Sequence, residues 1–360
     1  DVVALGGGVA GVAAAFEAAG QGRRALVIER RPALGWEIAW AHAPGAVHGP
    51  LADALAAEFA SMDVEAGGRV DPAFFEIALN RVLDRAGVSV LLYAQPVRVL
   101  VRDKTVRAAV VATKGGMRAF RSRTFVDASE NGLFWRQAGA TGEMTVQRGR
   151  YSVAFWTGPE HPEAEIGDVG QARGVRIGAY ARASMAELSF DVEHGSLIEA
   201  RLVLPEVLQA VRAPAGPLAA EAVVTHTGLE LLPVHVAPLE GAAGEPHAQA
   251  GNLYGAGVWL GSAVGADEAA ARLLEAGRSS GAAAAAAAPG QVEPAPTAAG
   301  APVDAAPSAC DVLVAGGGTG GALAGIAAAR RGCRTIVLEL GTCLGGVGSA
   351  GGIHSYYYGI

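Results

Sequence analysis

A glycine pattern occurs twice in this chain and limits its fold more than any other feature. Residues 6–11 read G-G-G-V-A-G and residues 316–321 read G-G-G-T-G-G, so both carry the spacing G-x-G-x-x-G. Each follows a short apolar run and precedes a stretch rich in alanine. A second apolar run then ends in an acid, Glu29 or Glu339, which lies 18 residues after the third glycine. This order predicts two strand–helix–strand units.

The glycine spacing has a direct physical reading as a dinucleotide-binding turn. The first glycine permits the tight turn, the second lets the backbone approach a pyrophosphate, and the third lets the helix pack close to the strand. The helix N-terminus offers free N–H groups and the positive end of its dipole to the phosphates. The acid accepts hydrogen bonds from ribose hydroxyls. The alternative is a glycine-rich turn without a ligand, and the complete order of elements disfavours it.

Composition narrows the class of protein. The chain has 360 residues, 51% hydrophobic and 18% charged, which is typical of a folded protein with more than one domain. Its net charge of −7 disfavours a nucleic-acid partner, including RNA. The three cysteines show no metal-ligand spacing, so no metal is expected. No apolar run is long enough to span a membrane, and we expect a cytoplasmic location and a small-molecule substrate.

The pattern of the remaining sequence predicts further elements and domain boundaries. Helices are expected at 9–20, 72–85, 133–138, 197–211 and 267–288, strands at 88–92, 97–102, 106–113, 118–123 and 124–127, and a loop at 31–50. Residues 141–250 mix strands with one helix and suggest an inserted domain. The segment 289–309 is rich in proline and alanine and reads as a linker. The chain lacks an initiator Met and stops after the second unit, so we interpret it as a fragment.

The order of these segments resembles the FAD-dependent oxidoreductases of the glutathione-reductase-like lineage with two dinucleotide-binding folds. Residues 126–132, V-D-A-S-E-N-G, are similar to the second flavin segment of that family, and residues 252–257, N-L-Y-G-A-G, to its final segment. The resemblance covers 1–140, 251–288 and 310–352 well, and 141–250 only loosely.

The resemblance implies an α/β fold with FAD as the cofactor. A Rossmann-like FAD-binding domain, 1–140 with 251–288, would combine a parallel sheet, helices and a small antiparallel β-meander. An α+β substrate domain, 141–250, would be inserted in it, and 310–360 would begin a second, truncated FAD-binding unit. The residues implied in FAD binding by the first unit are Gly6, Gly8, Val9, Ala10, Gly11, Glu29, Arg30, Gly35, Trp36, Val97, Ala128, Ser129, Gly257 and Gly261.

The second unit keeps the family pattern more closely than the first. Gly345 and Gly346 form the double glycine that lies beside the flavin ring in the family, whereas the first unit has Gly35 followed by Trp36. We therefore hypothesise that residue 311 opens a second flavin domain. Its implied cofactor-binding residues are Gly316, Gly318, Gly321, Glu339, Gly345 and Gly346.

Few residues are candidates for catalysis, because flavin itself would supply the redox chemistry. His226 is the first choice for acid–base work and His42 the second, with His48 on the same loop as His42. Arg69 and Arg201 could bind a substrate carboxylate. Each of these residues could instead have no catalytic role, as an ordinary loop histidine or a solvated surface charge.

The sequence thus predicts an oxidoreductase that transfers a hydride from an organic substrate to flavin N5. Two alternatives stay open. Glu130 stands where the family segment has glycine, and Val258 where many relatives have aspartate, which favours a non-catalytic FAD-fold scaffold for the domain that begins at residue 311. An NAD-dependent dehydrogenase ranks lower, since it would need neither the strand-rich segment nor the final glycine segment.

Overall fold

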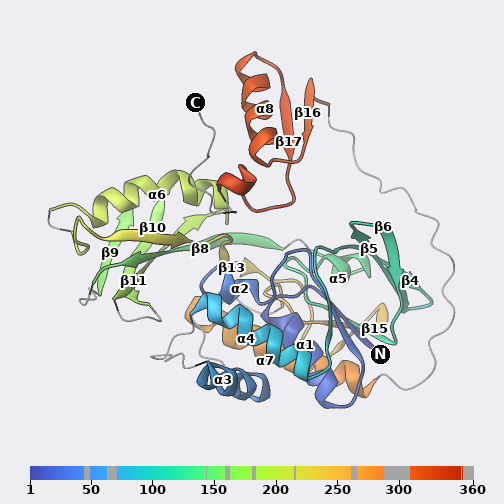
Figure 1. The fold of residues 1–360 in the computed structure, drawn as a ribbon. Helices are drawn as coiled ribbons and strands as arrows, with labels where there is room; N and C mark the ends of the chain where they lie inside the picture. Colours follow the sequence, from blue (N-terminus) through green and yellow to red (C-terminus); the bar gives the residue numbers. More distant parts are fainter. Residues whose placement is uncertain are drawn as a thin grey trace. The chain divides into compact units, whose positions relative to one another are not determined.

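The computed structural model describes residues 1–43, 49–62, 71–142, 144–158, 163–180, 184–214, 216–260, 266–287, 309–349 and 351. Its two compact units are Asp1–Ala298 and Ala299–Ile360. Figure 1 labels their helices and strands.

A mixed six-stranded sheet forms the centre of the first unit, in the order β14-β15-β7-β1-β2-β3. The strands are β1 (Val2–Leu5), β2 (Ala25–Ile28), β3 (Ser89–Leu91), β7 (Thr124–Asp127), β14 (Pro246–His247) and β15 (Ala250–Gly255). β1 is parallel to β2 and β7, and β15 is parallel to β7. All four residues of β1 are buried, as expected of a parallel strand covered on both faces.

Helices α1 (Val9–Gly20) and α7 (Ala266–Ala286) pack against each other beside this sheet (Figure 1). Their approach is close because a Cβ at Gly277 would lie 2.1 Å from the Ala10 carbonyl oxygen, and one at Gly281 would lie 2.3 Å from that of Ala14. The alanines and glycines of these helices therefore bring the two backbones into direct contact.

Three further helices cover the same part of the unit. α4 (Pro72–Arg85) begins as predicted, with Pro72 in its first turn and the Asp71 carboxylate accepting a hydrogen bond from the Ala73 N–H. The predicted loop at 31–50 is wrong in part, because it contains the short helix α2 (Trp36–Ala39) and the start of α3 (Pro50–Ser61). Gly35 is the N-cap of α2, and its φ of +61° lets the chain turn sharply after β2.

A three-stranded antiparallel meander follows, made of β4 (Gln95–Arg102), β5 (Thr105–Thr113) and β6 (Gly116–Phe120). It packs beside α5 (Leu133–Gln137), and its apolar side chains share one core cluster with β1 and β7. The predicted strand at 118–123 is shifted, because β6 already begins at Gly116, whose φ of +100° closes the turn from β5.

The segment between α5 and β15 builds a second sheet, in the order β12-β8-β11-β10-β9, with β13 also paired to β8. Its strands are β8 (Thr145–Trp156), β9 (Ala164–Val169), β10 (Ala172–Ala179), β11 (Met185–Glu193), β12 (Val223–Thr227) and β13 (Leu232–Ala237). The helix α6 (Leu197–Val211) packs on this sheet around a core of its own. The predicted fold class, a parallel-sheet domain with a meander and an inserted α+β part, is confirmed.

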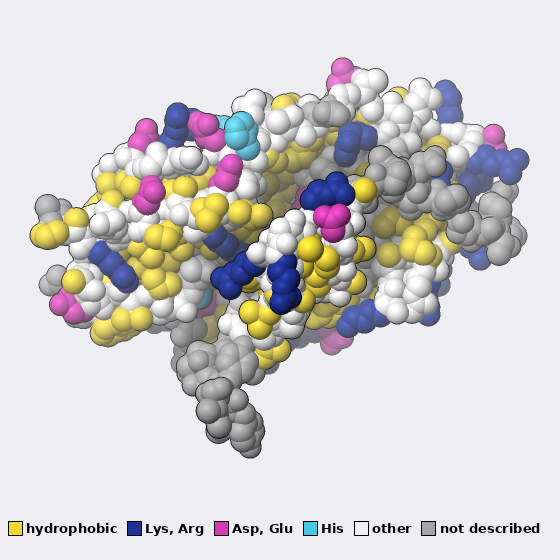
Figure 2. Space-filling model, turned by 90° about the horizontal axis from the view of Figure 1, so that it is seen from above, with side chains coloured by type: hydrophobic (Ala, Val, Ile, Leu, Met, Phe, Trp, Pro, Cys, Tyr) yellow, Lys and Arg dark blue, Asp and Glu magenta, His cyan; other side chains and the backbone are white. Residues whose placement is uncertain are grey.

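The second unit repeats the start of the first. β16 (Val312–Ala315) is parallel to β17 (Thr335–Leu338), with α8 (Thr319–Arg330) between them and a 3₁₀ turn at Gly346–Gly348. Several apolar side chains of this unit are exposed, Leu323 to 63% and Leu313 to 58%. Figure 2 shows that apolar side chains lie among the charged ones on the surface of the protein. Among the described residues, no helix combines the length and apolar character needed to cross a membrane.

Candidate functional site

The turn between β1 and α1 has room only for glycine at two of its positions. Gly6 has a φ of +119°, and a Cβ there would lie 2.2 Å from the Ala128 carbonyl oxygen. A Cβ at Gly11 would lie 1.9 Å from the Gly6 carbonyl oxygen. The turn, the helix and β7 are therefore in backbone contact, which is what the glycine spacing predicts of a dinucleotide-binding turn.

Glu29 lies at the end of β2 beside this turn. Its Oε2 accepts a hydrogen bond of 2.6 Å from the Gly7 N–H, and its Oε1 accepts from the backbone and the guanidinium of Arg31. The side chain is only 2% exposed. The predicted ribose acid is thus fixed against the glycine turn.

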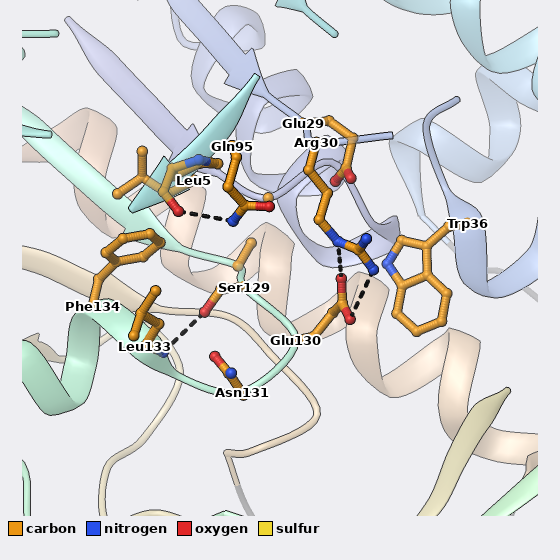
Figure 3. A pocket seen from close by; sticks show the side chains of 13 residues that line it. Leu5, Glu29, Arg30, Trp36, Gln95, Ser129, Glu130, Asn131, Leu133 and Phe134 are labelled. Carbon is orange, nitrogen blue, oxygen red and sulfur yellow. Dashed lines mark hydrogen bonds and ion pairs between the residues drawn. The ribbon is translucent and has the colours of Figure 1, made fainter. Parts of the chain in front are cut away.

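A cavity of about 240 Å³ opens at this point (Figure 3). It brings together residues from β1, the end of β2, the start of the meander and the segment after β7. Predicted cofactor residues among its lining are Gly6, Glu29, Arg30, Trp36, Ala128 and Ser129. Val97 is absent from the lining, where Gln95 and Pro96 stand instead, and Gly261 lies outside the described residues.

An ion-pair network closes one side of the cavity. Arg30 Nε lies 3.0 Å from Glu130 Oε1, and Arg31 Nη1 lies 2.7 Å from the same oxygen (Figure 3 shows the Arg30 pair). Arg31 Nε also contacts Glu230 Oε1 at 3.0 Å. Burial acts to lower the pKa of Arg31, but the neighbouring carboxylates raise it above its ordinary value. The glutamate that replaces the family glycine at position 130 is therefore the partner of two arginines.

Sequence reasoning missed Glu37, a residue of α2 whose carboxylate lies at the N-terminus of α1. Its Oε2 accepts a hydrogen bond of 2.9 Å from the Val9 N–H, and a Cβ at Gly8 would lie 2.3 Å from its Oε1. The side chain is 4% exposed. Burial raises the pKa of Glu37 to about 7, although the hydrogen bond from Val9 opposes this shift. The signal was an acid directly after Trp36, where the second unit has Val347 after Gly346.

The raised pKa of Glu37 makes stability depend on pH. The folded state keeps the proton between pH 4.5 and about pH 7 while the unfolded state releases it, so the free energy of unfolding falls as pH rises through this window. We expect a fall of roughly 3 kcal/mol, at about 1.4 kcal/mol per pH unit. Urea unfolding across this range measures it, and Glu37→Gln should remove this share of the slope. Equal slopes for both chains would contradict the expectation.

The turn of the second unit has the same geometry. Glu339 Oε2 accepts a hydrogen bond of 2.6 Å from the Gly317 N–H, as Glu29 does from Gly7. A Cβ at Gly321 would lie 1.8 Å from the Gly316 carbonyl oxygen. Hydrogen bonds from the backbone N–H groups, that of Gly341 first, lower the pKa of Glu339. The glycines at 318, 345 and 346 lie on this turn or on the loop beside it, and a Cβ at Gly346 would lie 3.0 Å from Gly318 Cα.

Two other predicted glycines contact protein side chains. A Cβ at Gly257 would lie 2.0 Å from Trp259 Nε1, and one at Gly35 would lie 2.5 Å from a ring carbon of Phe75. Trp259 is fully buried and donates a hydrogen bond of 2.8 Å to the Ser129 carbonyl oxygen. The indole ring of Trp259 thus contacts both the final glycine segment, at Gly257, and the second flavin segment, at Ser129.

The two predicted catalytic histidines lie side by side. The ring centroids of His42, just after α2, and His226, on β12, are 5.1 Å apart. Tyr180 Oη lies 2.9 Å from His226 Nε2, and Thr225 Oγ1 lies 3.1 Å from His226 Nδ1. His48 and Arg69 lie outside the described residues. Arg201 lies on α6. It lines neither the 240 Å³ cavity beside the glycine turn nor a second cavity, described below, that begins at His42.

His42 differs from its neighbour in burial and charge. Its side chain is 6% exposed, and its Nδ1 has no hydrogen-bond partner among the described residues. Burial and, to a smaller extent, the nearby His226 lower the pKa of His42 to about 3, although Asp71 opposes this shift. His42 is therefore a neutral imidazole at physiological pH, with one ring nitrogen that is buried and without a partner among the described residues.

A second cavity, of about 260 Å³, begins at His42 and extends over the face of the second sheet. Polar side chains from β8, β10 and β11 line it, including Arg150, Ser152, Arg176, Glu187 and Ser189. Arg150 Nε lies 2.7 Å from Asp191 Oδ1. No group of three residues suited to metal binding occurs in the part of the chain that the structure describes.

The parallel strands β1, β2 and β7, the glycine turn after β1 and the acid after β2 define a dinucleotide-binding fold. The model of the family FAD dependent oxidoreductase matches residues 1–154 and 311–358, more than half of the chain. The chain therefore belongs to this family of enzymes, whose cofactor is FAD. No curated protein sequence matches it.

Solved structures share the fold at low sequence identity. A flavin-dependent brominase aligns with a TM-score of 0.59 at 15% identity, over 81% of this chain and 80% of that chain. A flavoprotein/dehydrogenase from Cytophaga hutchinsonii gives 0.56 at 12% identity, over 79% and 78%. A myxobacterial chondrochloren halogenase gives 0.53 at 15% identity, over 76% and 72%. These likenesses establish the fold alone.

The residues of the first unit fit FAD at the turn and at the acid. Side chains are excluded at Gly6 and Gly11, Glu29 is held beside the turn, and a cavity adjoins both. Glu37 does not fit FAD in the same way, because its carboxylate accepts a hydrogen bond from the Val9 N–H at the N-terminus of α1. Gly6–Gly11, Glu29 and Ser129 are the residues that would hold the adenosine diphosphate part of FAD.

Proposed function

We propose that this protein oxidises an organic small molecule by transferring a hydride from it to N5 of FAD. The observation that carries the proposal is the pairing of His42 and His226 beside the polar cavity on the second sheet. The flavin supplies the redox chemistry when bound. The protein must then orient the substrate and move the proton that accompanies the hydride.

His226 is the residue we assign to proton transfer. Tyr180 and Thr225 lie within hydrogen-bond distance of its two ring nitrogens, which fixes the orientation of the ring. Its side chain is exposed, so a substrate hydroxyl or amine can approach the ring and replace one of these two hydroxyls at a ring nitrogen. An oriented histidine can accept a proton near neutral pH.

His42 has a different role in this proposal. Because it is buried and neutral, it is suited to a hydrogen bond with an uncharged polar group of the substrate rather than to proton transfer. The adjoining cavity offers serine hydroxyls and ion-paired arginines. The substrate class that matches these groups is a small polar molecule.

Anaerobic reduction of the bound flavin tests the function. The loaded full chain is mixed with panels of small alcohols, amines and hydroxy acids, and loss of the oxidised flavin absorbance is followed. We expect at least one class to reduce the flavin, and His226→Ala to slow that reduction by roughly 10²–10⁴-fold. His235→Ala is the control, because His235 lies on β13 of the same sheet and lines another cavity. Equal loss in both variants, or no reduction at all, would contradict the proposal.

A second candidate function is a scaffold that keeps the flavin fold without using it. It is favoured by Trp259, whose ring fills the space beside Gly257, and by the carboxylate of Glu37 on the helix N-terminus. Flavin content separates the two candidates. A full chain that neither purifies with flavin nor binds added FAD supports the scaffold.

A further inference from the structure

The N-terminus of α1 is occupied by a carboxylate of the chain itself. Glu37 Oε2 lies 2.9 Å from the Val9 nitrogen, and its Oε1 lies over Gly8, where a Cβ would approach it to 2.3 Å. In dinucleotide-binding turns these positions face the diphosphate, which accepts the N–H groups of the helix N-terminus. A carboxylate and a diphosphate oxygen therefore compete for the same donors.

The second unit provides an internal comparison. Residues 316–349 repeat the turn with a matching contact, since the Gly345 N–H donates to the Gly317 carbonyl at 2.9 Å as that of Gly35 does to Gly7 at 2.8 Å. At the position that matches Glu37 this unit has Val347, which is 51% exposed. The carboxylate is thus a local feature of the first turn and is not needed to form such a turn.

The charges around Glu37 oppose a further anion. Glu29 carries a second carboxylate beside the turn, and Arg31, which acts to lower the pKa of Glu37, already contacts Glu29, Glu130 and Glu230. A diphosphate placed here would meet a cluster in which the carboxylates outnumber the two arginines, Arg30 and Arg31. Removal of one negative charge is therefore the change most favourable to a diphosphate.

We propose that Glu37 gates the nucleotide site of the first unit. With its carboxylate ionised on the Val9 N–H, it excludes the diphosphate of FAD. Once it is protonated or withdrawn, it leaves the helix N-terminus to that ligand. This inference rests on the proposed function only in taking FAD as the ligand. It adds a regulation of FAD binding that family membership does not imply.

FAD binding to the full chain tests the gate. Binding is measured by equilibrium dialysis from about pH 6 to pH 9 for the wild type, Glu37→Gln and Glu17→Gln. Above about pH 7 we expect the wild-type affinity to fall by roughly tenfold per pH unit, because one proton must be taken up on binding. Glu37→Gln should bind more tightly by about tenfold at pH 8 and lose this dependence. Glu17→Gln removes the same charge from α1 away from its N-terminus and should behave as the wild type.

Two further variants serve as controls for this experiment. Glu37→Met removes the charge with a side chain of similar size and should reproduce the gain if the amide of glutamine misfolds the turn. Adding Gly11→Ala to Glu37→Gln should remove the gain without a further change of charge, because the added Cβ would lie 1.9 Å from the Gly6 carbonyl oxygen, which assigns the gain to the first unit rather than the second. Tight binding by the wild type with no gain in either Glu37 variant overturns the gate, as does a gain that survives Gly11→Ala. Such failures leave the flavin-reduction test of the proposed function untouched.

Discussion

Replacing Gly11 with alanine is expected to destabilise the first unit by about 3 kcal/mol and to abolish FAD binding to it. The added Cβ would lie 1.9 Å from the Gly6 carbonyl oxygen and 3.1 Å from Ala128 Cβ, so α1 has to move away from β1. Overpacking a well-packed core costs about 1–3 kcal/mol, and a backbone atom cannot rotate aside as a side chain can. Urea unfolding of the full chain and FAD titration measure the two effects.

Gly20→Ala is the matched control, because Gly20 ends the same helix. Among the described residues, no atom outside the adjoining backbone of the same helix lies within 4 Å of a Cβ built there. Alanine should therefore stabilise the helix by about 0.5–1 kcal/mol. Gly321→Ala should repeat the Gly11 effect in the second unit, where the approach is 1.8 Å. A Gly11→Ala chain as stable as Gly20→Ala would mean that the close approach of helix and strand is not required.

The glycine turns could be predicted because their constraint is local. A pattern of three glycines, an alanine-rich helix and an acid repeats within about 30 residues of a strand–helix–strand unit. Helix α1 accordingly lies at Val9–Gly20, as predicted, and α6 at Leu197–Val211. Caps, proline and helical periodicity supply these boundaries without reference to the rest of the chain.

For the second sheet, the sequence predicted only the α+β class of the domain and not the pairing of its strands. β8 is paired with β11, β12 and β13, so its partners come from segments up to 92 positions away in sequence (Thr145 with Ala237). Strand pairing over such distances is decided by the packing of whole elements, which periodicity in one segment does not encode. α3 was missed for another reason, since its sequence carries a local start signal, Pro50 in the first turn, that was not used.

The site was predictable in part for the same reasons. Histidine was chosen for its chemistry, and the topology then brought His42 and His226 together across 184 positions. Glu37 was passed over because a sequence pattern gives no direction for a side chain. Its effect depends on the fold of the loop after Gly35, which returns the carboxylate to the start of α1.

Trp259→Ala is expected to lower the free energy of unfolding by about 3–5 kcal/mol, the range for a buried tryptophan. The indole is fully buried against three glycines, Gly132, Gly255 and Gly257, none of which can fill the space left behind. Trp259→Phe keeps a ring but loses the hydrogen bond to the Ser129 carbonyl, and should cost about 1–3 kcal/mol. Trp156→Ala, at a side chain 52% exposed, should change stability by no more than about 0.5 kcal/mol.

The cavity wall should move with this indole, because Ser129 lines the cavity and its carbonyl is bonded to Trp259. If the flavin segments act through this contact, Trp259→Phe weakens FAD binding by more than the Trp156 control does, at a temperature where both variants remain folded. Unchanged FAD affinity in Trp259→Phe would restrict Trp259 to stability.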